Sequence, residues 1–198
     1  MGHAEAPGSE SAPGNLTPFL APLVALQGLL VRFENQGVII GGIAASLLGT
    51  PRLTADLDAV LLLGMEDIPR LLHEASMEGI FPRIPDCEAF ARKSHVLLLR
   101  HTTSETNIDI SLGLLPFEVE MVARSQVHHV GLIGLRLPTP EDLIILKAVA
   151  HRPKDLQDIQ GIAANHPGLD RERVEHWVRQ FADVLEMPEL WEDVAPLL

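Results

Sequence analysis

Two aspartates stand at the start of one of the most apolar runs in the chain. Asp56 and Asp58 open the stretch "ADLDAVLLL", whose composition predicts a strand. Side chains alternate along a strand, so both carboxylates would point to the same face. Adjacent carboxylates repel each other, and a divalent cation such as Mg²⁺, which prefers oxygen ligands, removes that penalty. Asp-x-Asp is a common tripeptide, however, and the pair alone also fits an ordinary polar strand start.

A third carboxylate strengthens the metal interpretation. Asp109 lies between two isoleucines in "TNIDISLG", a second predicted strand, where an unpaired charge is costly. Three carboxylates on neighbouring strands can hold one or two metal ions between the protein and a triphosphate. We therefore predict that Asp56, Asp58 and Asp109 bind Mg²⁺ or Mn²⁺.

A pair of glycines separates a short β-branched run from a short predicted helix. Gly41 and Gly42 follow "VII" and precede "IAASLL". Bare backbone N–H groups at the start of a helix make an anion site, although most Gly-Gly pairs are only turns. The order of features is more informative than the pair: strand, glycines, helix, then Arg52 and Thr54, then the aspartates.

This order resembles the nucleotidyltransferase superfamily whose fold is like the palm of DNA polymerase beta. Within it, the chain resembles the AbiEii/AbiGii-type toxin nucleotidyltransferases most closely. The stretch "GGIAASLLGTPRLTADLD" resembles their first motif, and "TPEDLIILKAVAHRPKDLQDI" resembles a downstream lysine followed by an Arg/Lys-Asp element. The resemblance covers residues 37–165.

The resemblance implies a role for each matching residue. Asp56 and Asp58 would bind Mg²⁺, and Asp109 would be a third ligand or the base that deprotonates the attacking hydroxyl. The implied nucleotide-binding residues are Gly41, Gly42, Arg52, Thr54, Lys147, Lys154 and Asp155. Structural alternatives stay open for the outer members of this set: a lysine that completes its helix end, a solvated Lys-Asp pair, or residues that only shape a loop.

The resemblance also implies an enzyme that moves a nucleoside monophosphate from an NTP to an acceptor hydroxyl. The acceptor stays open among a small molecule, a protein hydroxyl and a tRNA end. A toxin of this kind would have an antitoxin protein as a partner. The alternatives are an aminoglycoside- or lincosamide-type antibiotic nucleotidyltransferase and a non-catalytic module that binds nucleotide or a partner. The three carboxylates speak against the non-catalytic module, because a scaffold gains nothing from them.

Composition narrows the range of partners and settings. The 198 residues include 15 basic and 27 acidic ones, a net charge of −12, which argues against binding to bulk duplex DNA. The single Cys87 excludes an intramolecular disulfide and a multi-cysteine metal site. No apolar run approaches the roughly 20 residues of a membrane span. We therefore expect a cytoplasmic protein with no membrane partner.

Predicted helices and strands interleave along the chain, which favours an α/β (α+β) fold. We predict a mixed β-sheet flanked by helices, of the polymerase-beta-like type. Residues 1–16 are predicted to be a disordered tail, residues 17–165 the nucleotidyltransferase domain, and residues 166–198 a helical C-terminal extension. A strand pair or hairpin is expected in "VGLIGLRLPTP", whereas residues 80–92 fit neither helix nor strand clearly.

Overall fold

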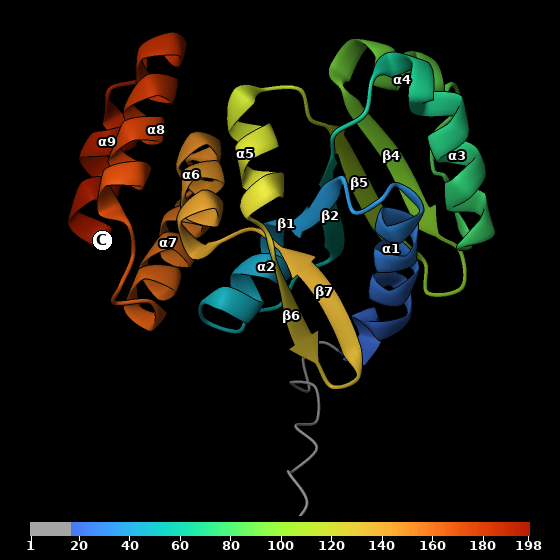
Figure 1. Ribbon diagram of the computed structural model, residues 1–198, viewed down its shortest axis with the longest axis horizontal. Helices are drawn as coiled ribbons and strands as arrows, with labels where there is room; N and C mark the ends of the chain where they lie inside the picture. The colour runs from blue at the N-terminus through green and yellow to red at the C-terminus, as the bar shows by residue number, and fades with distance from the viewer. Residues whose placement is uncertain (1–16) are drawn as a thin grey trace, which may run out of the picture.

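A five-stranded mixed sheet forms the centre of the protein (Figure 1). The computed structural model describes residues 17–198, so the tail predicted over residues 1–16 lies outside the described residues. The strands run in the order β1-β2-β5-β4-β3, with β2 and β5 parallel and the other neighbours antiparallel. They are β1 (Gly37–Ile40), β2 (Asp56–Leu61), β3 (Ile80–Pro82), β4 (Val96–His101) and β5 (Thr106–Leu112). This mixed sheet with its flanking helices confirms the predicted fold class.

The two faces of the sheet differ in burial because side chains alternate along each strand. Ile108 and Ile110 of β5 are fully buried, whereas Asp109 between them is only partly buried. Strand β4 alternates in the same way, with Leu97 and Leu99 buried. The buried side chains join one hydrophobic core with apolar residues of α1 (Leu20–Arg32), α3 (Ile68–Met77) and α4 (Cys87–Ser94). The other face is left partly open, and it carries the polar side chains.

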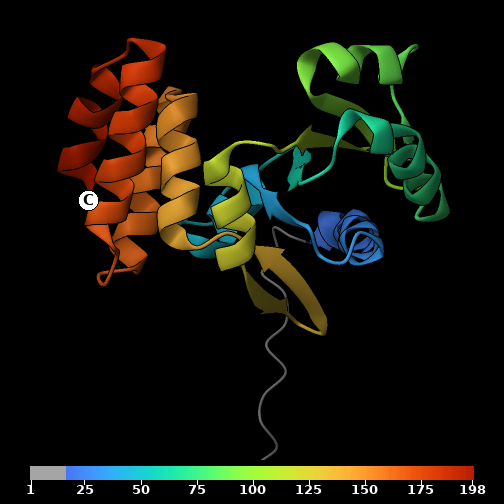
Figure 2. The same cartoon turned by 45° about the horizontal axis from the view of Figure 1, so that its top comes forward.

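Four helices stack beside the sheet, on the side opposite α3 and α4 (Figure 2). They are α6 (Pro140–Ala150), α7 (Pro153–Asn165), α8 (Arg171–Leu185) and α9 (Glu189–Val194). Helix α2 (Gly41–Leu48) lies between this bundle and the sheet, in contact with β2, α6 and α7. The residues beyond 165 are helical, and α8 packs directly on α6, so they share one bundle with the two helices before them.

The segments that were hard to interpret from sequence take short, regular forms. Residues 80–92 contain β3 and the start of α4. The expected hairpin exists, but it begins earlier than predicted: after α5 (Pro116–Arg124) it consists of β6 (Gln126–Val130) and β7 (Ile133–Leu137). Strand β6 was missed because its sequence, "QVHHV", is mostly polar and only Val130 is buried. Short 3-10 turns cover Thr17–Phe19, Met65–Asp67 and Ala195–Leu197.

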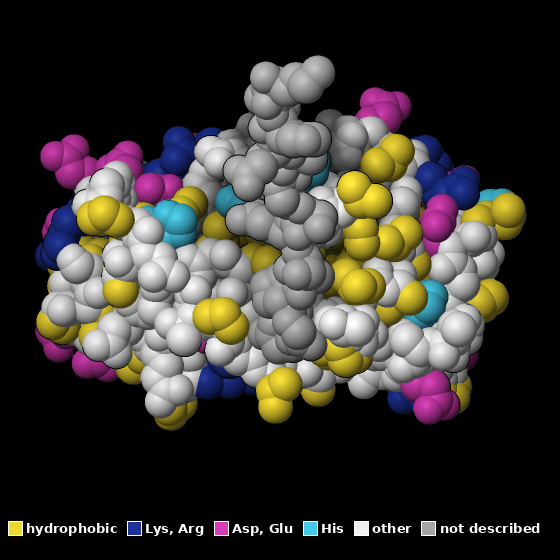
Figure 3. Space-filling model, turned by 90° about the horizontal axis from the view of Figure 1, so that it is seen from below, with side chains coloured by type: hydrophobic (Ala, Val, Ile, Leu, Met, Phe, Trp, Pro, Cys, Tyr) yellow, Lys and Arg dark blue, Asp and Glu magenta, His cyan; other side chains and the backbone are white. Residues whose placement is uncertain are grey.

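One face of the molecule separates hydrophobic from charged side chains. In the described part of the face seen in Figure 3, hydrophobic side chains gather near the middle, acidic and basic side chains lie mostly toward the edges, and Lys and Arg form no continuous stripe. Within residues 17–198, none of the helices combines the length and the apolar character that a bilayer span requires.

A buried carboxylate joins the helical bundle to α5. Asp142 on α6 is completely buried. It accepts one hydrogen bond from Nε of Arg173 on α8, at 2.7 Å, and one from Nε of Arg124 on α5, at 3.3 Å. Because a buried ion that loses its partner is costly, these contacts should couple the three helices.

Asp142→Ala should therefore lower the free energy of unfolding by about 3 kcal/mol, since it leaves Arg173 without its buried partner. Urea denaturation monitored by circular dichroism measures the change. The matched control is Glu175→Ala, which removes an exposed pair with Arg179 on the same helix α8 and should cost about 0.5 kcal/mol or less. Equal effects of the two substitutions would contradict the structural role of Asp142.

Candidate active site

Two of the predicted carboxylates face each other across neighbouring strands. Asp58 of β2 lies directly opposite Asp109 of β5. Residues paired in register point to the same face of a sheet, so both carboxylates emerge on the partly open face. Asp56, two residues earlier on β2, shares that face and lies opposite Asn107. The parallel pairing of β2 with β5 thus brings all three predicted carboxylates to one face.

These carboxylates line a pocket with a volume of about 340 Å³, within the range of small-molecule sites. Nine of the ten predicted site residues border it, and Asp155 is the exception. The full lining is Ile40, Gly41, Gly42, Arg52, Thr54, Asp56, Asp58, Asp109, Leu143, Leu146, Lys147, Ala150, Arg152 and Lys154. The pocket therefore has three walls: the sheet with its carboxylates, the start of α2, and the facing sides of α6 and α7.

Helix α2 begins with two glycines, Gly41 and Gly42, and the backbone there approaches other residues too closely for a side chain. Strand β1 passes directly into the helix at Gly41, whose φ of +70° lies in the left-handed region. A Cβ atom on Gly41 would lie 2.0 Å from Oδ2 of Asp58, and one on Gly42 would lie 2.6 Å from Oγ1 of Thr54. The N-cap residue, Ile40, has no side chain that could bond the first N–H groups of the helix. These N–H groups are accordingly available to an anion in the pocket.

An ionic network centred on the buried residues Lys147, Asp155 and Asp158 forms the wall opposite the sheet. Lys147 of α6, only 4% exposed, donates to Oδ1 of Asp155 at 3.0 Å and contacts Oδ2 of Asp158 at 2.8 Å. Arg52 donates two hydrogen bonds to Asp158, from Nε to Oδ1 at 2.6 Å and from Nη2 to Oδ2 at 2.8 Å. Arg152 donates to Asp155 through Nε at 2.5 Å. The network fixes the positions of three cations, of which Lys147 is held most tightly.

The acidic members of this network stay charged because their cationic partners outweigh burial. Burial alone would raise the pKa of Asp155 and of Asp158. Hydrogen bonds from Arg152 and Lys147 to Asp155, and from Arg52 and Lys147 to Asp158, lower both pKa values below the ordinary range. Asp155 is thus neither a pocket-lining residue nor part of a solvated pair with Lys154. It lies behind the pocket and holds Lys147 and Arg152 in place.

At Asp58, by contrast, burial outweighs the effect of the nearby cations on the pKa. Its pKa is raised, mainly by burial and then by the charges of Asp109 and Asp56, with partial compensation from Lys147 and Arg152. A carboxylate that is costly to ionise, and that lies beside two others, is stabilised by any cation that enters the pocket. The repulsion between neighbouring carboxylates, from which the sequence predicted a cation site, is therefore present in the folded protein.

The residues present fit a hard divalent cation by the chemistry of their donors. Oxygen ligands from Asp56, Asp58 and Asp109 are those that Mg²⁺ and Mn²⁺ prefer. Within residues 17–198, however, no three acidic, histidine or cysteine side chains are gathered into a ready-made metal cluster. Asp109 instead forms an ion pair with Arg83, which contacts both of its carboxylate oxygens.

Three charged residues at the site were not among the sequence-based candidates. Arg152 borders the pocket, Asp158 joins Arg52 to Lys147, and Arg83 pairs with Asp109. The Arg/Lys-Asp element matched to Lys154 and Asp155 begins two residues after Arg152 and is the signal that could have found it. No sequence signal marks Arg83, because it lies in the segment 80–92 that fitted neither helix nor strand.

Known structures share this fold, although the sequence itself matches no protein-family model and no curated protein. The solution structure of the antibiotic-resistance factor ANT(2'')-Ia matches with a TM-score of 0.54 at 15% identity, covering 85% of this chain and 95% of that one. The crystal structure of ANT(2'')-Ia in complex with adenylyl-2''-tobramycin gives a TM-score of 0.52 at 16% identity, covering 83% and 98%.

A third structure gives a similar result. The crystal structure of an antigenic nucleotidyltransferase-like protein from Paracoccidioides brasiliensis has a TM-score of 0.52 at 15% identity, covering 93% of this chain and 94% of that one. At this level of identity the likeness establishes the fold, and it confirms the nucleotidyltransferase fold expected from the motifs. The closer resemblance to AbiEii/AbiGii-type toxins stays a prediction.

The contact between Gly41 and Asp58 leads to a stability prediction. Gly41→Ala should lower the free energy of unfolding by about 2 kcal/mol or more, because a left-handed φ costs a non-glycine residue roughly 1–2 kcal/mol and the new Cβ also displaces Asp58. Chemical denaturation measures the loss. Gly168→Ala is the control: a Cβ there meets nothing within 4 Å, so the change should stay within about 0.5 kcal/mol.

The raised pKa of Asp58 predicts a stability that depends on pH. Its folded-state pKa exceeds its unfolded one, so the cost of ionising it is absent at low pH and grows as the pH rises through the folded-state value. Asp58→Asn should therefore raise the Tm of the metal-free protein at pH 7.5 by about 2–4 °C, the shift that about 1 kcal/mol gives at this size.

Thermal melts at pH 7.5 and pH 4 test this sign, with Asp183→Asn, an exposed carboxyl on α8, as the control. The gain from Asp58→Asn should shrink toward pH 4, because the Asp58 carboxyl then becomes protonated in the unfolded protein as well as in the folded one. A gain that is larger at pH 4 than at pH 7.5 would contradict the assigned direction of the pKa shift.

Proposed function

We propose that this protein is a metal-dependent nucleotidyltransferase, which moves a nucleoside monophosphate from an NTP to an acceptor hydroxyl. One observation carries the proposal: Asp58 and Asp109 face each other in register on one wall of a pocket whose other walls are a helix start and a cluster of cations. A triphosphate with its metal ions needs this combination of carboxylates, backbone donors and positive charges.

Each wall of the pocket has a separate role in the proposed reaction. Asp56, Asp58 and Asp109 would hold Mg²⁺ or Mn²⁺, which stabilises negative charge on the attacking and leaving oxygens when bound. The N–H groups at Gly41 and Gly42 would bind phosphate oxygens. Arg152 and Lys154, the exposed cations at the rim, would neutralise charge on the departing pyrophosphate, while the ionic network fixes Lys147 behind them.

The proposed reaction balances without a further reactant. The acceptor oxygen attacks the α-phosphorus in line, the bond from that phosphorus to the bridging oxygen breaks, and pyrophosphate leaves. The proton of the hydroxyl passes to a carboxylate of the site or to water. Catalysis then depends on positioning and charge neutralisation, as in other phosphoryl transfers. Because NTPs are cytoplasmic metabolites, this reaction fits the cytoplasmic setting expected from the sequence.

A small, cationic acceptor is the class we favour. One structural neighbour, ANT(2'')-Ia, was crystallised with adenylyl-2''-tobramycin, an adenylylated aminoglycoside. The net charge of −12 on the present chain would attract a polycation of this kind and would repel nucleic acid. We therefore propose an aminoglycoside-like amine with a free hydroxyl as the first acceptor to test.

A second candidate rests on the sequence motifs. The stretch "GGIAASLLGTPRLTADLD" resembles the AbiEii/AbiGii-type toxins, which implies a tRNA end or a protein hydroxyl as acceptor and an antitoxin as partner. The same assay separates the two candidates, because the labelled product is a small molecule in one case and a macromolecule in the other.

The test is transfer of label from α-³²P-NTPs, with Mg²⁺ or Mn²⁺, to aminoglycosides, bulk tRNA and protein. We expect label on one acceptor class with release of pyrophosphate, and a loss of about 10³-fold or more for Asp58→Asn. Glu175→Gln, an exposed change on α8, is the control and should keep full activity.

Binding is measured in parallel by thermal shift. An NTP with Mg²⁺ should raise the Tm of the wild-type protein through binding linkage, and Asp58→Asn should reduce this metal-dependent gain. Absence of both labelled product and any NTP-dependent shift with either metal would overturn the proposal in favour of a non-catalytic module.

A further inference from the structure

Arg83 stands in line with the facing carboxylates. Its backbone N–H donates to the carbonyl of Leu98 at 3.0 Å, which continues the antiparallel pairing of β3 with β4. Leu98 lies opposite Asp109, and Asp109 lies opposite Asp58. Leu98, Asp109 and Asp58 therefore form one row across β4, β5 and β2. Arg83, the residue after β3, extends this row, and residues of one row share a face of the sheet.

The guanidinium of Arg83 reaches from the β3 edge of the sheet, past β4, to Asp109 on β5. Nη1 donates to Oδ1 of Asp109, and Nη2 donates to Oδ2 at 3.3 Å. Nη1 also donates to the carbonyl of Leu99 at 3.2 Å, which anchors the side chain over β4. The side chains of Arg83 and Asp109 are only 20% and 27% exposed, so solvent screens this pair only partly. Both carboxylate oxygens of Asp109 are thus in contact with one cation.

We propose that Arg83 is a positioning residue that competes with the metal ion for Asp109. This inference rests on the proposed function, since it assigns Asp109 to the metal site. With the pocket free of metal, Arg83 balances a carboxylate that faces Asp58, a group already costly to ionise. A metal ion that binds Asp109 needs an oxygen that Arg83 holds. Because each oxygen keeps a second lone pair, a metal ion would share that oxygen with Arg83, and the charge and hydrogen bonds of Arg83 would weaken its binding to the metal ion.

The competition has a definite consequence for affinity. Removing Arg83 takes away both a positive charge that repels the metal ion and the hydrogen bonds that weaken the oxygens of Asp109 as ligands. Metal binding should therefore become tighter, while the metal-free protein should become less stable because Asp58 and Asp109 are left uncompensated. A purely structural arginine would produce only the loss of stability, with unchanged or weaker metal binding.

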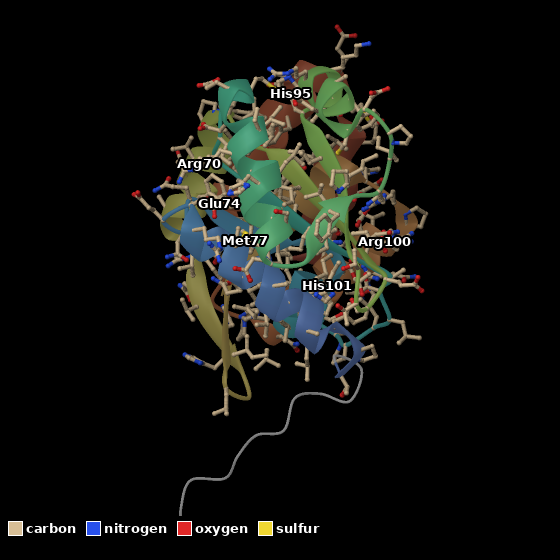
Figure 4. All side chains as sticks on the ribbon, turned by 90° about the vertical axis from the view of Figure 1, so that its right-hand side faces the viewer. Arg70, Glu74, Met77, His95, Arg100 and His101 are labelled. Carbon is tan, nitrogen blue, oxygen red and sulfur yellow. The ribbon has the colours of Figure 1, made fainter. Side chains whose placement is uncertain are left out.

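The structure supplies a matched control in the next polar row. Arg100 lies near the end of β4 (Figure 4), and its Nε donates to Oδ1 of Asn107 at 3.1 Å. Asn107 lies opposite Asp56, so this row parallels that of Arg83 but contains no contact with Asp109. Arg100→Gln removes the same charge from the same sheet face without releasing Asp109.

The experiment measures binding of Mn²⁺ alone, without nucleotide, to the full chain by calorimetry and electron paramagnetic resonance. Arg83→Gln should tighten the Kd for Mn²⁺ by about five-fold or more, a change on the scale of one charge-assisted hydrogen bond. Arg100→Gln should change it by less than about two-fold. Arg83→Lys keeps the charge but loses the bidentate geometry and should fall between wild type and Arg83→Gln.

A double substitution shows whether the effect passes through Asp109. In an Asp109→Asn background, Arg83→Gln should not change the Kd for Mn²⁺ by a measurable amount. If Arg83→Gln proves too unstable to study, Arg83→Lys carries the same comparison.

Several results would overturn the inference. Unchanged or weaker Mn²⁺ binding by Arg83→Gln, with normal binding by wild type, overturns it while leaving the proposed function intact. A full effect of Arg83→Gln in the Asp109→Asn background also overturns it. If neither wild type nor Arg83→Gln binds Mn²⁺ at millimolar concentration, the inference fails, and the proposed function is then decided by the labelled transfer assay alone.

Discussion

Asp58 and Asp109 face each other across the parallel strands β2 and β5, and their repulsion costs free energy whenever both are ionised. The backbone fixes this arrangement, because neither residue can leave the row without a change in strand register. Burial of Asp58 increases the cost. A fold that keeps two carboxylates in such a position needs positive charge nearby, and the surrounding elements supply it from more than one side.

The compensating charges come from opposite directions and differ in how firmly they are held. Arg83 reaches Asp109 from the edge of the sheet, whereas Lys147 and Arg152 face the carboxylates from the helical bundle. Lys147 is held by two buried aspartates, so it can contribute charge without moving. Around the pocket, five cations and five carboxylates balance: Arg52, Arg83, Lys147, Arg152 and Lys154 against Asp56, Asp58, Asp109, Asp155 and Asp158. A bound triphosphate with its metal ions would also be nearly neutral, and could enter without a large change in net charge.

The fold and the activity rest on different evidence. Structures with 15–16% identity and TM-scores of 0.52–0.54 establish a nucleotidyltransferase fold for this chain. Fold alone does not determine function, so the proposed reaction depends on the pocket and its charges. The proposed choice of acceptor depends on still other features, chiefly the net charge of −12 and the exposed cations Arg152 and Lys154 at the rim. This is why the site supports a reaction type more strongly than it supports a particular substrate.

The sequence by itself determined the mixed α/β class and the strand–Gly-Gly–helix order. It also identified ten candidate residues, nine of which border one pocket in the folded protein. It could do so because Gly41, Asp58 and Asp109 lie in short motifs whose strand and helix periods are local properties of the chain. Only the tertiary structure decided that Asp155 lies behind the pocket, that Asp158 bridges Arg52 and Lys147, and that Arg83 pairs with Asp109. Those contacts join residues 8 to 106 positions apart, and they follow from strand register and helix packing, which no local pattern encodes.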